Sequence, residues 1–192
     1  MSDAPAPTHP RPRRHDPGRR DRIVDVCIEV IAAHGVEGVS LRRVAEAADV
    51  PLGSMTYHFS GRDELLRVAF TRFAESVSDR WTSRIAALPT DDREAAIQAV
   101  VDLITQDVFP DTDELVLTHE LYTLAARDPR YRELTNAWMR RSRQALERSF
   151  DPATARILDA LIEGLSIHRA LDTEPPVDAD VELAVRRVTR AD

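Results

Sequence analysis

The chain of 192 residues contains no lysine, a single cysteine and no apolar run long enough to cross a bilayer. One cysteine, Cys27, excludes a disulfide within the chain and a cysteine-based zinc cluster. A spanning helix needs roughly 20 apolar residues, and the first residues lack the charged and apolar regions of a secretion signal. We therefore expect a soluble cytoplasmic protein of one domain or two small ones.

The alternating pattern of β-strands and the motifs of common catalytic sites are missing as well. Valine and isoleucine recur at three- and four-residue steps, which is typical of amphipathic helices. The sequence shows no glycine-rich phosphate loop, no serine nucleophile elbow and no zinc-ligand spacing. We expect a protein that is not an enzyme and holds no metal and no cofactor.

Helix start and stop signals predict an all-α fold of about nine helices, three of them short and placed before residue 60. Aspartate N-caps followed by proline, at Asp128-Pro129 and Asp151-Pro152, begin two of them. Ser60 with Asp63 forms a capping box, and Asp91 with Glu94 caps another helix. The first predicted helix ends at Gly35. The other eight span residues 41–48, 52–58, 62–86, 92–108, 114–127, 129–150, 152–171 and 178–190.

The first 18 residues are rich in proline and arginine and poor in large apolar side chains. Such a segment buries too little surface to offset its ordering entropy, so residues 1–18 are expected to form a disordered arm. Judged from its residues alone, the arm keeps the chain soluble. We assign residues 19–61 to a helix-turn-helix domain and residues 62–192 to a second helical domain.

The stretch from Ser40 to Leu66 carries the functional signal. Two short helices are separated by a three-residue turn, the arrangement of a helix-turn-helix. Ala45 is small enough for the two helices to approach, and Asp49 tolerates the left-handed conformation that the turn requires. Gly53 and Ser54 keep the start of the second helix slim, as is needed to reach base edges in a major groove.

The run LRRVAEAA-VP-GS--YHF--RDELL, with dashes for other residues, resembles the N-terminal domain of the TetR family of transcriptional repressors. The resemblance covers roughly residues 20–73 in order and spacing, whereas the remaining helices fit by architecture only. It implies an N-terminal helix-turn-helix DNA-binding domain and a C-terminal effector-binding and dimerisation domain. In some members of the family an arginine-rich arm such as residues 1–18 enters the DNA minor groove, which is the alternative to a solubilising tail. The implied DNA-binding residues are Ser40, Arg42, Leu52, Gly53, Ser54, Thr56, Tyr57, His58 and Arg62.

Two of these positions depart from the family pattern. Thr56 replaces a frequent aromatic residue, and Leu52 is apolar where other members are polar, which favours contacts with thymine methyl groups. Judged without the resemblance, Phe59 is expected in the core, Tyr57 fits the core or the DNA surface equally, and His58 alone would be a surface histidine.

The net charge of −7 and the pI of about 5.4 argue against a nucleic-acid partner at first sight. Residues 9–58, however, carry eight arginines against seven acids, whereas residues 76–192 carry 15 against 22. Affinity for DNA depends on local neutralisation of phosphates. The acidic balance therefore belongs to the C-terminal part and does not exclude DNA binding.

The C-terminal helices are expected to hold a small-molecule effector and a two-fold interface. The ligand-binding candidates are polar or aromatic residues on apolar stripes: Trp81, Phe109, His119, Tyr122, Thr135, Trp138, Met139 and Ser142. For the aromatic residues among them, ordinary core packing is the favoured interpretation, and His119 fits a buried hydrogen-bonded histidine or a ligand contact equally. The dimer candidates, for which packing within the chain is the alternative, are Leu158, Leu161, Ile162, Leu165, His168, Val181 and Val185.

We expect a homodimeric repressor that binds a pseudo-palindromic DNA operator and is released by a small-molecule effector. The alternatives are a regulator controlled by a protein partner, an activator, and a ligand-binding helical module that has lost affinity for DNA. The sequence does not name the effector, although the candidate side chains favour a mostly apolar or aromatic molecule.

Overall fold

A computed structural model describes residues 17–86, 92–107 and 112–190. These residues contain a 3₁₀ turn, η1 (Val36–Gly38), a π-helical turn, η2 (Leu103–Asp107), and no strand. The predicted all-α fold is confirmed. The α-helices are α1 (Arg19–His34), α2 (Leu41–Ala47), α3 (Leu52–His58), α4 (Arg62–Ala86), α5 (Arg93–Asp102), α6 (Thr112–Arg127), α7 (Pro129–Leu146), α8 (Pro152–Leu171) and α9 (Asp178–Val188).

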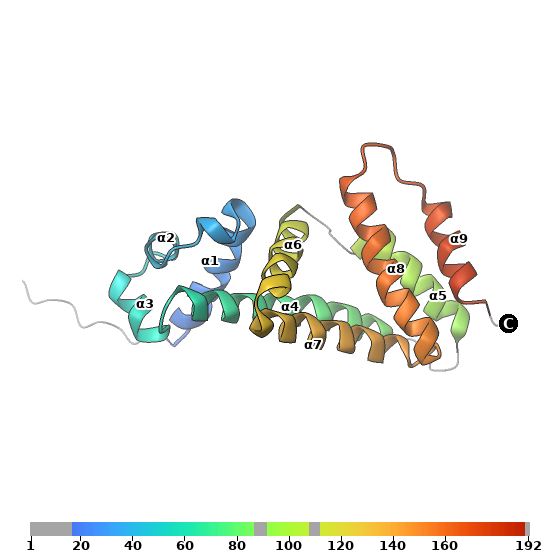
Figure 1. Cartoon of the computed structure of the whole chain (residues 1–192), viewed down its shortest axis with the longest axis horizontal. Coiled ribbons are helices and arrows are strands. Elements are labelled where there is room, and N and C mark those ends of the chain that lie inside the picture. Colours follow the sequence, from blue (N-terminus) through green and yellow to red (C-terminus); the bar gives the residue numbers. More distant parts are fainter. Residues whose placement is uncertain (1–16, 87–91, 108–111, 191–192) are drawn as a thin grey trace, which may run out of the picture.

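The helices form an elongated molecule (Figure 1). Helices α1–α3 lie at one end and α5, α8 and α9 at the other, while α4 and α7 run along the length between them. Helix α6 stands across α4 and α7 near the middle. None of the described helices combines the length and hydrophobicity needed to cross a bilayer.

Side-chain caps explain most of the helix starts. Asp128 accepts a hydrogen bond from the Arg130 amide (2.9 Å), and Asp151 accepts from the amides of Ala153 and Thr154 (both 3.0 Å), as the Asp-Pro signals predict. Two predicted caps are wrong by one residue.

The cap of α5 is Asp92, which accepts from the Ala95 amide at 2.8 Å, and the predicted Asp91 lies outside the described residues. At α4, the Ser60 amide donates to Glu64 at 2.7 Å, so Glu64 and not Asp63 closes the capping box. Helix α7 also stops at Leu146, short of the predicted Phe150. Beyond Leu146 the amides of Arg148 and Ser149 donate to carbonyls three residues back (3.3 and 3.0 Å), so the α-helix ends in a tighter turn.

The turn between α2 and α3 has the predicted left-handed residue. Asp49 has φ 51° and is the one non-glycine residue with positive φ in the described ranges. Glycine takes this conformation at the end of α1, where Gly35 has φ 66°. A Cβ on Gly35 would also lie 2.6 Å from Glu120 Oε1, so α6 closely approaches the end of α1.

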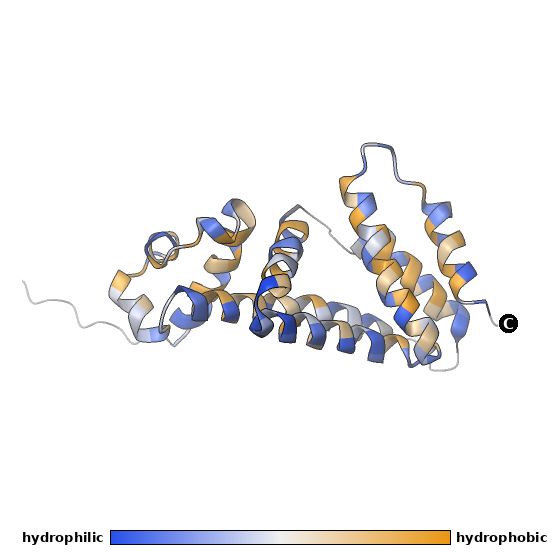
Figure 2. Cartoon of the chain, viewed as in Figure 1, coloured by the Kyte–Doolittle hydropathy of each residue, from blue (hydrophilic) through white to orange (hydrophobic). Residues whose placement is uncertain are grey.

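Two apolar cores lie at the two ends of the molecule. The first joins α1–α3 and the first half of α4 with residues of α6 and α7, including Leu117, Leu121 and Tyr131. The second joins α5, η2, α8, α9 and the end of α7, with Trp81 contributed by α4. Hydrophobic residues are correspondingly dense on α5 and α8, and hydrophilic ones follow the outer edge of α7 (Figure 2). The first core thus extends past residue 61, into the segment that we assigned to the second domain.

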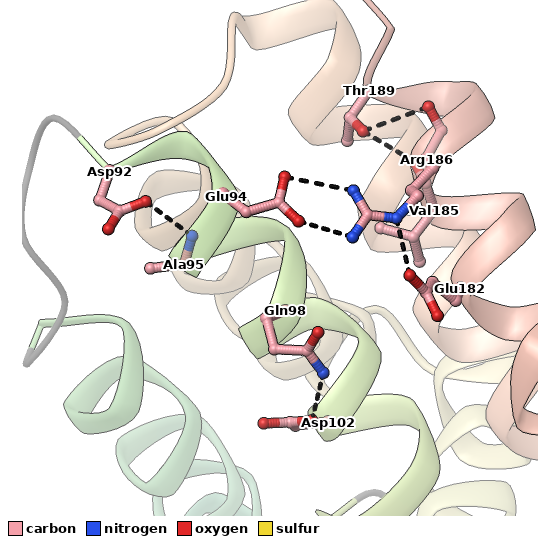
Figure 3. Close-up of polar contacts among 9 residues, drawn as sticks. All are labelled: Asp92, Glu94, Ala95, Gln98, Asp102, Glu182, Val185, Arg186 and Thr189. Carbon is pink, nitrogen blue, oxygen red and sulfur yellow. Dashed lines mark hydrogen bonds and ion pairs between the residues drawn. The ribbon is translucent and has the colours of Figure 1, made fainter.

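Polar contacts fix α9 against α5 (Figure 3). The guanidinium of Arg186 contacts both oxygens of Glu94 (2.5 and 3.2 Å) and also donates to Glu182 at 2.8 Å. These groups are largely exposed, so the network contributes modestly to stability. Burial of Val181 and Val185 in the second core supplies the larger stabilisation.

The conformation of Asp49 yields a stability prediction. Asp49→Ala should lower the free energy of unfolding by about 1 kcal/mol, because Cβ without a polar group disfavours positive φ. Asp49→Gly should cost less, since glycine adopts this conformation without strain. Urea unfolding of the three proteins measures the order, and equal losses for alanine and glycine would contradict the explanation.

Candidate nucleic-acid interface and ligand cavity

The outer face of α3 is exposed and apolar in part. Tyr57 is 83% exposed and Leu52 is 51% exposed, which is unusual for such large side chains. The Tyr57 ring has an edge-on contact with His58, at 4.9 Å between centroids. On the opposite face, Met55 and Phe59 are buried, as predicted for Phe59. Tyr57 therefore belongs to the surface and not to the core, which settles the alternative left open by the sequence.

Gly53 has no structural reason to be glycine within the chain. Its φ is not positive, and a Cβ placed on it would meet no other atom within 4 Å. Glycine in a helix costs about 0.5–1 kcal/mol relative to alanine. The fold thus leaves room for a larger side chain here, and the predicted role of Gly53 at a DNA interface stays a prediction.

The remaining predicted DNA-binding residues surround this face. Ser40 caps α2 by accepting from the Arg43 amide at 3.1 Å, and Thr56 donates to the Gly53 carbonyl at 3.2 Å. Arg42 pairs with Glu46 at 2.9 Å, with 81% of the Arg42 side chain exposed. An exposed i, i+4 pair is worth only a few tenths of a kcal/mol, so a phosphate can replace Glu46 at little cost. Ser54 is half-buried near the start of α3.

Arg62 has an internal role that the sequence did not predict. Its guanidinium donates to the Val39 carbonyl (2.8 Å) and to the Val36 carbonyl (2.6 Å). These bonds tie the start of α4 to the segment that precedes α2. Its predicted contact with phosphate stays a prediction, and it would use the N–H groups left over from these two bonds.

The basic arm lies mostly outside the described residues, of which the first is Pro17. Beyond the arm, in the first turn of α1, Arg20 places its guanidinium 5.2 Å from the centre of the Phe59 ring. This cation–π contact joins the start of α1 to the end of α3.

A cavity of about 450 Å³ lies between the two cores. Helices α4, α6, α7 and α8 line it together with η2, which contributes Leu103 and Gln106. A π-helical turn of this kind is frequent at functional sites. Five of the eight predicted ligand-binding residues line the cavity: Trp81, Tyr122, Trp138, Met139 and Ser142.

Of the other three predicted residues, Thr135 and His119 are not among the lining residues. Thr135 is buried and donates to the Arg132 carbonyl at 3.1 Å, within its own helix. His119 is half-buried, with Nδ1 bonded to the Leu115 carbonyl at 2.8 Å. Phe109 lies outside the described residues.

Aromatic rings form one side of the cavity. The rings of Tyr122 and Trp138 are nearly parallel, 17° apart, with 6.2 Å between their centroids. Trp138 also meets Phe73 edge-on at 6.1 Å. Trp81 Nε1 and Thr118 Oγ1 are buried in the wall without a hydrogen-bond partner. Buried polar atoms usually have a hydrogen-bond partner, so these two atoms are available to a group that enters the cavity.

Three carboxylates in the wall, Glu114, Asp159 and Glu163, were missed from the sequence. Burial raises the pKa of Asp159, opposed by a hydrogen bond with Ser142 and by the charge of Arg143. Burial also raises the pKa of Glu163, opposed by a hydrogen bond with Tyr122, while the charge of Asp159 raises it further. Asp159 and Glu163 are four residues apart on α8, so their position within an apolar stripe of that helix could have identified them from the sequence.

Four of the predicted dimer residues face inward instead. Leu158, Ile162, Val181 and Val185 are buried in the second core of the same chain, because α5 and η2 cover that face of α8 and α9. Leu161 and Leu165 pack partly against the same core, and His168 is exposed. The large apolar side chains exposed on this end are Ile157, Leu171, Val177 and Leu183.

Cys27 is buried in the first core. Burial raises the pKa of its thiol to about 12, opposed by the charge of Arg62. The thiolate is therefore scarce at neutral pH, and only the thiolate is a nucleophile.

Two family models match the chain. The model described as "Bacterial regulatory proteins, tetR family" matches residues 23–69, and the one described as "Tetracyclin repressor-like, C-terminal domain" matches residues 91–191. A curated relative, the HTH-type transcriptional regulator PksA of Bacillus subtilis (strain 168), is 27% identical over 169 residues, which is 80% of each chain.

Solved structures match over nearly the whole length. SCO7518 from Streptomyces coelicolor A3(2) is 51% identical, with a TM-score of 0.84 over 91% of this chain and 100% of its own. The multidrug binding protein EbrR, in complex with ethidium, is 32% identical, with a TM-score of 0.71 over 91% of this chain and 99% of its own. EbrR has also been solved with proflavin and with malachite green.

The raised pKa of Glu163 leads to a prediction about stability. At neutral pH the folded chain holds the half-buried carboxylate of Glu163 in its disfavoured charged form, so Glu163→Gln should raise Tm, by about 2–4 °C for each kcal/mol relieved. The gain in Tm should be full at a pH above the raised pKa of Glu163 in the folded state. It should disappear as the pH falls below the pKa of an ordinary glutamate, because the carboxyl is then protonated in both states.

Calorimetry over a range of pH measures this gain. The control is Glu133→Gln, at an exposed position of α7, which should leave Tm unchanged. A Glu163→Gln protein that is less stable than the parent at neutral pH would contradict the prediction.

Proposed function

Because the chain belongs to the TetR family of bacterial regulatory proteins and is a DNA-binding transcriptional regulator, we propose that it is a repressor released by a small molecule. In this proposal a homodimer binds a pseudo-palindromic operator, and a ligand in the cavity lowers its affinity for DNA. The observation that carries the proposal is the outer face of α3, where an open Gly53 and an exposed Tyr57 have no role inside the chain.

A dimer follows from the size of this face. Helix α3 has seven residues, which read too few base pairs for useful specificity, and two-fold dimers read half-sites about 34 Å apart. The exposed side of α8 supports a partner copy there. Ile157 and Leu171 are exposed on it, and between them the exposed Gly164 has open space where a Cβ would lie.

The cavity supports control by an effector over control by a protein partner. Stacked aromatic rings favour a flat or aromatic molecule, and the wall carries Glu114, Asp159 and Glu163 against Arg80 and Arg84. Carboxylates in an apolar surrounding attract a cation strongly. EbrR, whose printed ligands include ethidium, proflavin and malachite green, supports the same class. The proposed effector is an aromatic cation.

Operator binding is tested on DNA that flanks the gene for this protein, by mobility shift against unrelated DNA of equal length. Tyr57→Ala combined with His58→Ala should abolish the specific shift without unfolding the chain. Gly53→Ala should raise stability by about 0.5–1 kcal/mol and yet weaken the shift, because its methyl group stands where DNA approaches.

The control is Glu29→Ala, at an exposed position of α1 in the same domain, which should leave the shift unchanged. Equal binding to unrelated DNA would refute specific repression, and full binding by the Tyr57/His58 variant would refute the assigned surface.

Effector class is tested by titrating the protein with ethidium in the absence of DNA, because ethidium intercalates. Glu163→Gln should weaken binding by about tenfold, equivalent to 1.4 kcal/mol, since one attracting charge is lost. For the parent, affinity should fall as the pH is lowered through the raised pKa values of Asp159 and Glu163. Affinity that is independent of both changes would exclude charge recognition by α8.

A further inference from the structure

An ion pair connects α4 to α6 at the wall of the cavity. Arg80 of α4 contacts Glu114 of α6, with 2.5 Å between Nη2 and Oε2. The two partners differ in exposure: 53% of the Arg80 side chain but only 11% of the Glu114 side chain is accessible. The solvent-accessible guanidinium of Arg80 thus neutralises the almost fully enclosed carboxylate of Glu114.

The other two carboxylates of the wall have a different environment. Glu163 is hydrogen-bonded with Tyr122, and Asp159 is hydrogen-bonded with Ser142. The nearest guanidinium to Asp159, that of Arg143, is 4.0 Å away. Glu114 is therefore the carboxylate of the cavity that is held in a short contact by an arginine of the same wall.

Helices α4 and α6 both reach from the cavity to the helix-turn-helix. At its start, α4 is tied to that domain by the bonds of Arg62 to the carbonyls of Val36 and Val39. On α6, Leu117 and Leu121 are buried in the first core, while Thr118 and Tyr122 line the cavity. The Arg80–Glu114 pair thus connects two elements whose relative position affects the placement of α3.

We propose that Arg80 is an internal competitor of the cationic effector: its guanidinium occupies Glu114 in the empty cavity, and a bound cation that displaces it uncouples α4 from α6. The proposal rests on the proposed function. Removing a guanidinium from an enclosed carboxylate costs free energy, so displacement of Arg80 is favoured when another positive charge takes its place. The state with displaced Arg80 has the lower affinity for operator DNA.

Because of this competition, a ligand can bind in the cavity without releasing the operator DNA. A neutral aromatic molecule can fill the cavity and satisfy Trp81 Nε1 and Thr118 Oγ1, but it leaves the Arg80–Glu114 pair closed. A ligand shifts a conformational equilibrium only by its differential affinity for the two states. Cations therefore release DNA, whereas neutral molecules of similar shape do not.

The test compares Arg80→Gln with Arg141→Gln. The control removes the same charge and also breaks an ion pair of α4, because Arg141 contacts Asp79 on the outer surface, away from the cavity wall. Each protein is titrated with tetraphenylphosphonium, a permanent aromatic cation without a flat ring system to intercalate, and with operator DNA.

Arg80→Gln should bind the cation about tenfold more tightly than the parent and bind operator about tenfold more weakly without any effector, within the 5- to 150-fold range of known allosteric couplings. Arg80→Lys, which keeps the charge, should lie close to the parent, and Arg141→Gln should match the parent in both titrations. Triphenylphosphine oxide, a neutral analogue, should not release the operator.

Unchanged operator affinity in Arg80→Gln would overturn the proposal even if the cation binds more tightly, because a merely local charge effect has no reason to reach the DNA. Release by the neutral analogue at the same occupancy would overturn it too. If the parent binds operator specifically but never responds to a cation, the competition is refuted and DNA binding stands. If the parent shows no specific DNA binding, the proposed function itself fails.

Discussion

The unbroken backbone of α4 is the constraint on which the rest of the structure depends. The helix extends over 25 residues, about 37 Å at 1.5 Å per residue. Phe70 belongs to the first core and Trp81 to the second. This one helix therefore joins the wall of the cavity, through Trp81, to the bonds of Arg62 beside the helix-turn-helix.

Helix α6 is a second helix that joins the first core to the cavity. Leu121 is fully buried in the first core, and the next residue, Tyr122, lines the cavity. The close approach of Glu120 to Gly35 adds a contact with the end of α1. The first apolar core includes residues from both predicted domains, so the packing shows no boundary at residue 61.

The two functional regions share a signature: each keeps groups that lower the stability of the isolated chain. Gly53 sits in a helix with nothing packed against it, Tyr57 exposes most of its ring, and burial disfavours the charged form of Glu163. Violations of local rules in an otherwise regular helical protein are expected at functional sites. Their concentration on α3 and around one cavity supports a chain that couples DNA to a charged ligand.

The sequence by itself determined the helices, the two Asp-Pro starts, the left-handed Asp49 and the helix-turn-helix, because periodicity, caps and turns depend on residues a few positions apart. Only the tertiary structure decided what each helix packs against. An apolar stripe is buried equally well by the same chain or by a partner, so Leu158 and Val185 fitted an interface equally well until both were found buried in the second core of the same chain. Glu114, Asp159 and Glu163 come from α6 and α8, and their convergence on one cavity arises from the crossing of helices distant in sequence, which no local pattern records.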